Sequence, residues 1–236
     1  ALGERLAFPQ IGSCYGLSVQ NFNAATNQRL KNLKLNHLHV QINFQFENWK
    51  LYFEKAIEFG IPLELILFLD ENSEQPLSEL IFNIHQKKVQ IDSITIFSTS
   101  KIVSQLADWQ KFSPILRNQF PSCKLGAGTN QYFAELNRNR IDFEGIDFLK
   151  FPVNPQVHAI DDLTIIESLE VQGDMVKSTQ SFIRPPTEIH ISPIYLKSGT
   201  NIKNFNVYPE NPENVIESRQ FKVLNAGWFL SSIANF

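Results

Sequence analysis

The sequence has few of the residues and patterns that mark specialised protein classes. Only 2 of its 236 residues are cysteines, so it cannot carry a disulfide framework, and neither Cys14 nor Cys123 lies in a spacing typical of a zinc site. No apolar run approaches the roughly 18 residues that cross a membrane, and no signal peptide is recognisable. No GxGxxG or GxxxxGK[ST] motif follows any strand pattern, which argues against the usual nucleotide-binding loops.

The chain also lacks an excess of charge of either sign. It has 21 Lys+Arg against 24 Asp+Glu and no basic run, so we expect it to bind neither nucleic acid nor a membrane surface. No set of His, Cys, Asp and Glu has ligand spacing, so we expect no metal and no organic cofactor. The cysteine usage favours a cytoplasmic location, with the periplasm as the alternative if a leader was removed, since the sequence starts without Met.

What the sequence does contain is an alternation of strand and helix patterns along its whole length. The expected strands cover residues 5–16, 35–44, 62–70, 93–98, 123–127, 148–153 and 188–196. The expected helices have three kinds of support. Asn23 suits the N-cap of a helix in which Leu30 and Leu33 share a face. Gly60 suits the C-cap of the next helix, whose inward-facing residues are Trp49, Phe53, Ala56 and Ile57. Pro76 suits the first turn of the helix after that. Further helices are expected through Trp109 to Phe120, over 163–181, and over 214–236 through Phe221, Leu224, Trp228 and Leu230.

This order of elements favours a (β/α)8 TIM-type barrel over a doubly wound sheet. Seven strands are expected, so the barrel lacks its eighth strand within residues 1–236. We expect a single domain over residues 1–236 that is part of a longer protein. The open edge between the first and seventh strands should be covered by a neighbouring chain or by an additional segment or domain.

Alternation within the strands predicts a polar barrel interior. In the second strand Leu38, Val40 and Ile42 share one face and His37, His39, Gln41 and Asn43 the other. The sixth and seventh strands divide similarly, with Lys150 opposite Leu149 and with Glu188 and His190 opposite Ile189 and Ile191. We interpret Lys150, Glu188, His37 and His39 as a hydrogen-bonded core in which Lys150 pairs with Glu188 or another acid. Cys14 is interpreted as a small buried thiol.

Two polar segments follow the fifth and sixth strands, where the active sites of parallel barrels lie. After the fifth strand come Asn130, Tyr132, Glu135, Asn137 and Arg138. Glu135 can act as a general acid or base, or it can be a solvated loop residue paired with Arg138 or Arg140.

After the sixth strand come Asn154, Gln156 and His158, and an imidazole in this place can transfer a proton. Asp161 or Asp162 can orient His158 or can cap the following helix. Asn130, Asn154 and Gln156 suit recognition of sugar hydroxyls. Asp70 and Tyr195 also lie near strand ends and can complete a pocket wall.

The segments GTNQYFAELNR (128–138) and VNPQVHAIDDLTIIESLEVQ (153–172), followed by ISPIYL (191–196), resemble the central barrel domain of the D-apionate lactonase family. The resemblance implies a hydrolase that opens a sugar-acid lactone on a barrel related to those of glycoside hydrolases, with further domains in full-length members. By position it marks the polar residues of both segments, which are Asn130, Tyr132, Glu135, Asn137, Arg138, Asn154, Gln156, His158 and Asp161. The small-molecule partner is then a carbohydrate or a sugar acid.

Two alternatives stay open at this point. A retaining glycosidase needs two carboxylates about 5 Å apart, but the seventh strand ends without an acid, so Glu135 with Asp70 or Asp161 would have to serve an inverting mechanism. The other alternative is a carbohydrate-binding barrel without catalysis. In the lactonase interpretation Glu135 and His158 share the proton transfers, and either can be the acid or the base.

Overall fold

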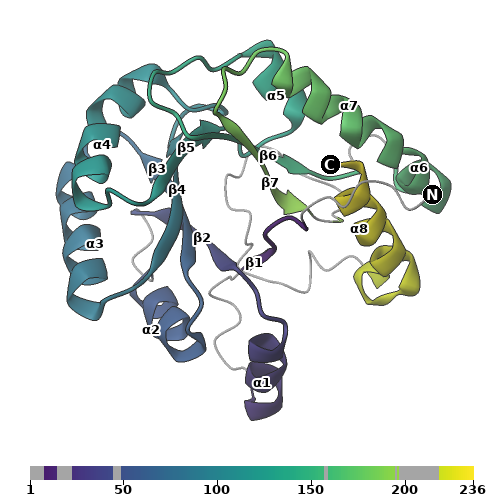
Figure 1. The fold of residues 1–236 in the computed structure, drawn as a ribbon, viewed down its shortest axis with the longest axis horizontal. Coiled ribbons are helices and arrows are strands. Elements are labelled where there is room, and N and C mark those ends of the chain that lie inside the picture. The colour runs from purple at the N-terminus through teal and green to yellow at the C-terminus, as the bar shows by residue number, and fades with distance from the viewer. Residues whose placement is uncertain (1–7, 15–22, 45–48, 157–158, 195, 197–217) are drawn as a thin grey trace.

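A computed structural model describes residues 8–14, 23–44, 49–156, 159–194, 196 and 218–236. Strands and helices alternate along the chain (Figure 1). The strands are β1 (Gly12–Cys14), β2 (His37–Asn43), β3 (Leu63–Leu69), β4 (Ile91–Ser98), β5 (Lys124–Gly128), β6 (Phe148–Val153) and β7 (Glu188–Ile194). The helices are α1 (Ala24–Asn32), α2 (Lys50–Phe59), α3 (Glu74–Lys87), α4 (Leu106–Gln119), α5 (Phe133–Arg138), α6 (Asp162–Glu167), α7 (Leu169–Gln180), the 3-10 turn η4 (Ser218–Phe221) and α8 (Val223–Asn235).

The seven strands form one parallel sheet in the order of the sequence, from β1 to β7. The sheet curls into a nearly closed barrel with the helices on its outside (Figure 1). This is the predicted TIM-type barrel. Within the described ranges no eighth strand is found, and β1 and β7 do not pair with each other.

The predicted division of strand faces is confirmed. Leu38, Val40 and Ile42 of β2 are buried in the large apolar cluster that contains the inward-facing residues of α2, α3 and α4. On the opposite face His39 contacts residues of β3 and β6 inside the barrel. Parallel strands covered by helices must be apolar on the outer face, and this requirement fixes which face of each strand points inward.

The upper part of the barrel interior, toward the strand ends, holds a separate apolar cluster. Ile66 and Phe68 of β3 and Phe97 of β4 are buried together there, and the rings of Phe68 and Phe97 lie 5.7 Å apart between centroids. Glu64 precedes Ile66 on the same inward face of β3. The inward face of β3 is therefore polar at Glu64, near the start of the strand, and apolar closer to its end.

The predicted helix boundaries at Asn23 and Gly60 are confirmed. The Asn23 side chain accepts a hydrogen bond of 2.9 Å from the backbone N–H of Thr26, which caps α1. Gly60 ends α2 in the left-handed conformation with φ 66°, which glycine adopts without steric cost.

Several predicted helix faces are wrong. Ile57 of α2 is 51% exposed, because the buried face of that helix consists of Tyr52, Phe53, Ala56 and Phe59. Leu33 ends α1 and is 63% exposed, and no residue of α1 itself is buried. In the last helix Trp228 is buried, but Phe221 and Leu230 are exposed, and the helix begins at Val223. The expected start of that helix at residue 214 lies outside the described residues.

The helix expected over 163–181 is divided in two at Ser168. The Ser168 hydroxyl donates to the carbonyl of Ile165 at 2.7 Å, and the residue ends α6 and precedes α7. A serine side chain competes for backbone carbonyls in this way and favours a break. In the part of the chain that the structure describes, no helix is both long and apolar enough to cross a membrane.

Substitution of Gly128, at the end of β5, tests how closely β5 and β6 approach each other. A Cβ atom there would lie 1.9 Å from the backbone oxygen of Lys150, so Gly128→Ala should lower the free energy of unfolding by about 1–3 kcal/mol or more. Gly227 of α8 has open space around it, and Gly227→Ala should raise that free energy by about 0.5–1 kcal/mol. Urea denaturation measures both. Equal effects of the two substitutions would contradict the close approach of β5 and β6.

Candidate active site

The segments that follow β5 and β6 lie side by side. The two strands pair in parallel, with Gly126 opposite Phe148 and Gly128 opposite Lys150. The backbone N–H of Thr129 then donates to the carbonyl of Lys150 at 2.9 Å. The polar residues from Asn130 onward thus begin next to β6, at the end of the barrel where Asn154 leaves that strand.

Thr129 fixes the start of the first polar segment. Its hydroxyl donates to the carbonyl of Ile102 at 2.6 Å and accepts from the backbone N–H of Gln131 at 3.0 Å. Thr129 and Val103 also form a short antiparallel bridge. These bonds attach the segment to the loop that follows β4 and set the course of the chain into Tyr132 and α5.

Glu135 lies in the first turn of α5, where its carboxylate pairs with a guanidinium three residues on. The distance from Arg138 Nη1 to Glu135 Oε1 is 2.6 Å, and the side chains of Glu135 and Arg138 are 26% and 69% exposed. The pairing with Arg138, one of the two interpretations of Glu135 from the sequence, is therefore present. Asn137 is exposed and accepts from Arg140 at 3.2 Å.

The residues after β6 are held more tightly. Asn154 and Gln156 are 8% and 4% exposed, and the backbone N–H of Gln156 donates to the Asn154 side-chain oxygen at 3.1 Å. Both amide side chains are therefore largely shielded from solvent. His158 and Tyr195 lie outside the described residues, so their contacts with Glu135 or Asp161 stay predictions.

Asp161 is the N-cap of α6. Its carboxylate accepts hydrogen bonds from the backbone N–H of Thr164 at 2.9 Å and from the Thr164 hydroxyl at 2.8 Å. These bonds lower the pKa of Asp161 from its usual value. The capping role predicted for one of the two aspartates thus belongs to Asp161, while Asp162 pairs with Arg219 at 3.2 Å.

Inside the barrel, Lys150 pairs with Glu64 of β3. Glu64 also accepts from His39 Nδ1 at 2.6 Å. The alternative partner predicted for Lys150, Glu188, instead pairs with Lys124 at the rim, at 2.7 Å. Glu64 was not among the expected polar core residues, although it is the single acid within an otherwise apolar strand, and that pattern was the available signal.

Burial alone would raise the pKa of Glu64, but the neighbouring Lys150 and His39 outweigh it and hold that pKa well below its usual value. Burial, together with Lys150, lowers the pKa of His39. Glu64 is therefore a carboxylate and His39 a neutral imidazole at pH 7.

Cys14 of β1 is exposed, so the prediction of a buried thiol is wrong. The reason is its position on an edge strand that pairs only with β2 in the described part of the chain.

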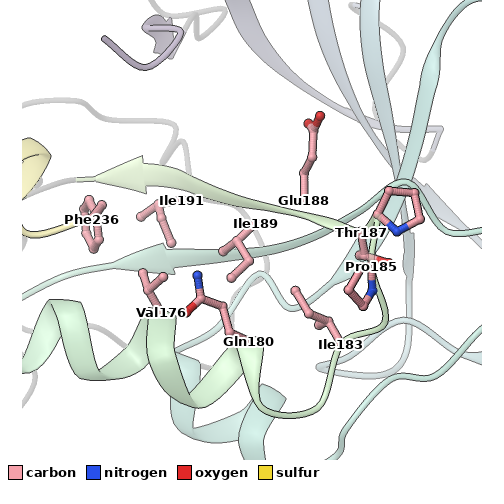
Figure 2. Close-up of a pocket in the computed structure, with 10 residues that line it drawn as sticks. Val176, Gln180, Ile183, Pro185, Thr187, Glu188, Ile189, Ile191 and Phe236 are labelled. Atoms are coloured by element: carbon pink, nitrogen blue, oxygen red, sulfur yellow. The ribbon is translucent and has the colours of Figure 1, made fainter. Parts of the chain in front are cut away.

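A cavity of about 520 Å³ lies elsewhere, on the outer face of β7. Figure 2 shows Ile189 and Ile191 pointing into it toward Val176 of α7, whereas Glu188 points to the opposite side of the strand. Its lining contains none of the residues predicted for the site. Among the residues that the structure describes, no group of three or more His, Cys, Asp or Glu is arranged to hold a metal ion.

Comparison with known proteins supports one family. The sequence profile of the family described as "D-apionate lactonase, TIM barrel domain" matches residues 11–236. A protein of Brucella anthropi named "D-apionate lactonase" is 40% identical over 65 residues, which are 28% of this chain and 11% of that protein. The matched region is thus a small part of a much longer relative.

The bonds made by the Thr129 hydroxyl allow a direct test of how the first polar segment is held. Thr129→Val keeps the shape but removes the hydroxyl, so the Ile102 carbonyl loses a donor and the Gln131 N–H loses an acceptor in a buried place. We expect the free energy of unfolding to fall by about 1–3 kcal/mol. Thr129→Ser, which keeps the hydroxyl, should lose less. Urea denaturation of the two variants checks this, and an equal loss in both would show that the hydroxyl does not hold the segment.

Proposed function

The chain belongs to the D-apionate lactonase TIM-barrel family, and from this we propose that it is a hydrolase that opens a sugar-acid lactone. Membership of a lactonase family supports hydrolase activity at the level of the family. The observation that carries the finer proposal is the pairing of β5 with β6, which brings the two polar segments of the family match to one end of the barrel. Active sites of such barrels lie at this end.

Opening a lactone makes three chemical demands on the site. A water molecule must lose a proton as it attacks the carbonyl carbon, the developing oxyanion needs a hydrogen-bond donor, and the ring oxygen must gain a proton as it leaves. We assign the two proton transfers to Glu135 and His158. Asn130, Asn154 and Arg138 supply donors for the oxyanion or for the carboxylate of the sugar acid.

The remaining residues of the two segments suit recognition of the sugar. Tyr132, Asn137 and Gln156 offer hydroxyl and amide groups for its hydroxyls, and we assign the same role to Tyr195. The cap made by Asp161 faces Thr164, so we assign Asp161 the placement of the chain just after His158 rather than a proton transfer.

The glycosidase alternative gains no support from the carboxylates it would need. Asp70 accepts from the backbone N–H of Asn72 and from the Ser73 hydroxyl, both at 2.9 Å, and these bonds stabilise the turn before α3. Asp161 is engaged in its cap. A substrate panel of sugar-acid lactones and aryl glycosides, with binding measured by calorimetry, separates lactonase, glycosidase and non-catalytic binding.

Glu135→Gln and His158→Ala test the catalytic assignment. Loss of a general acid or base costs about 10²–10⁴-fold in rate, so each variant should hydrolyse the lactone at least about a hundredfold more slowly while it still unfolds cooperatively. The matched controls are Glu170→Gln and His85→Ala, two exposed residues of α7 and α3, which should turn over at the normal rate. Near-normal turnover in either test variant would refute the assignment of that residue.

A further inference from the structure

Buried polar side chains from four strands meet in the lower part of the barrel interior. Lys150 of β6 pairs with Glu64 of β3 and lies 3.3 Å from His39 Nδ1 of β2. The Ser192 hydroxyl of β7 lies 3.3 Å from His39 Nδ1 and donates to Glu64 at 3.4 Å. Lys150, Glu64 and His39 are only 1–2% exposed, so we call these three residues the interior ion cluster.

The cluster joins strands that are not neighbours in the sheet. β4 and β5 lie between β3 and β6, so Lys150 reaches Glu64 across the interior and not along the sheet. In the described ranges β1 and β7 do not pair. In this part of the chain, the strand-to-strand hydrogen bonds that link β6 and β7 to β2 and β3 therefore run through β4 and β5.

The contacts of the interior ion cluster also restrict how its side chains can be oriented. A carboxylate that accepts from His39 Nδ1 at 2.6 Å places the imidazole proton on that nitrogen, and the ammonium of Lys150 occupies the other carboxylate oxygen. A buried ion pair with both oxygens engaged has few alternative arrangements. The spacing between the two halves of the barrel is therefore set at this point.

We propose that Glu64, His39 and Lys150 are positioning residues, which hold β6 and β7 against β2 and β3 and thereby place Asn154 and Gln156 of the candidate site. Asn154 follows Lys150 by four residues along an extended chain, about 13 Å at 3.3 Å per residue, so the cluster acts through the strand and does not touch the substrate. The part of the proposal that concerns catalysis rests on the proposed lactonase function.

Lowering the pH should weaken the connection of β6 and β7 to β2 and β3. The groups that face His39 are Glu64 of β3, Lys150 of β6, Ser192 of β7, His37 of its own strand and Cys14 of β1, its register partner. A protonated His39 would stand beside the Lys150 ammonium, and two like charges there repel. His39 takes up a proton on unfolding at a pH below its usual value of 6.5, because its pKa is lowered in the folded chain. The contribution of a neutral His39 to folding stability is therefore fully present above about pH 6.5 and is lost as the pH drops.

Hydrogen exchange of the chain 1–236 tests the connection without any assay of activity. The variant carries Glu64→Gln and Lys150→Met together, so that neither charge is left buried alone. We expect amides of β6 and β7 to exchange at least about tenfold faster, while those of β3 and β4 stay protected. The matched control is Lys124→Met with Glu188→Gln, which removes an exposed Lys–Glu pair that also ends on β7 and should change little.

The His39→Gln variant provides the second measurement if the double variant does not fold. In the wild type, exchange in β6 and β7 should speed up between pH 7.5 and 5.5 after correction for intrinsic exchange, and this change should be reduced in His39→Gln but kept in His85→Gln, which replaces an exposed histidine of α3. Unchanged protection of β6 and β7 in the double variant, or an equal loss in all seven strands, would overturn the proposal. So would a pH response that His39→Gln leaves intact.

Lactone turnover then shows whether the connection matters for the site. The double variant should lose about 10–100-fold in kcat/KM, as expected for misplaced binding groups, and the acid limb of the wild-type pH profile should shift in His39→Gln. Wild-type protein without lactone turnover would refute the proposed function, while the exchange data would still decide on the connection. Altered exchange with unchanged kcat/KM would refute the positioning role.

Discussion

The ion pair between Lys150 and Glu64 is the interaction on which the barrel interior depends. Removing a charge from water costs several kcal/mol even after the protein relaxes, so neither residue is tolerable there without the other. Glu64 and Lys150 lie on strands separated by two others, and their contact requires the sheet to have curled. The pair therefore forms only when the barrel does, unlike exposed pairs such as Lys50 with Glu79, which contribute little.

The barrel architecture could be predicted from the sequence because the patterns that indicate strands and helices are local. The apolar run of β3 predicted a strand, and alternation in β2 predicted both a strand and its inward face, since helices must cover the outer face. Narrower features were not predictable in this way. A helical pattern identifies a face but not its width, which is why Ile57 was expected to face inward and is exposed.

The sequence predicted at which end of the barrel the candidate site lies, but not most of the contacts that its residues make. Neighbouring parallel strands end at the same side of a sheet, so the segments with Asn130 and Asn154 had to lie close together. The partner of Lys150 could not be read from the sequence, because Glu64 is 86 residues away in the chain and several acids were available. For Asp161 the deciding signal was local, a threonine three residues on that completes a helix cap.

The apolar cluster of Ile66, Phe68 and Phe97 separates two parts of the inward faces of β3 and β4. These buried side chains lie between the interior ion cluster and the strand ends that carry the candidate site. Near the strand starts, His37 and His190 lie beside the cluster and are 15% and 24% exposed. The groups of the cluster that change charge with pH and the residues assigned to ligand binding therefore lie toward opposite ends of the barrel. A change of pH and a bound ligand would act first on different layers of the same strands.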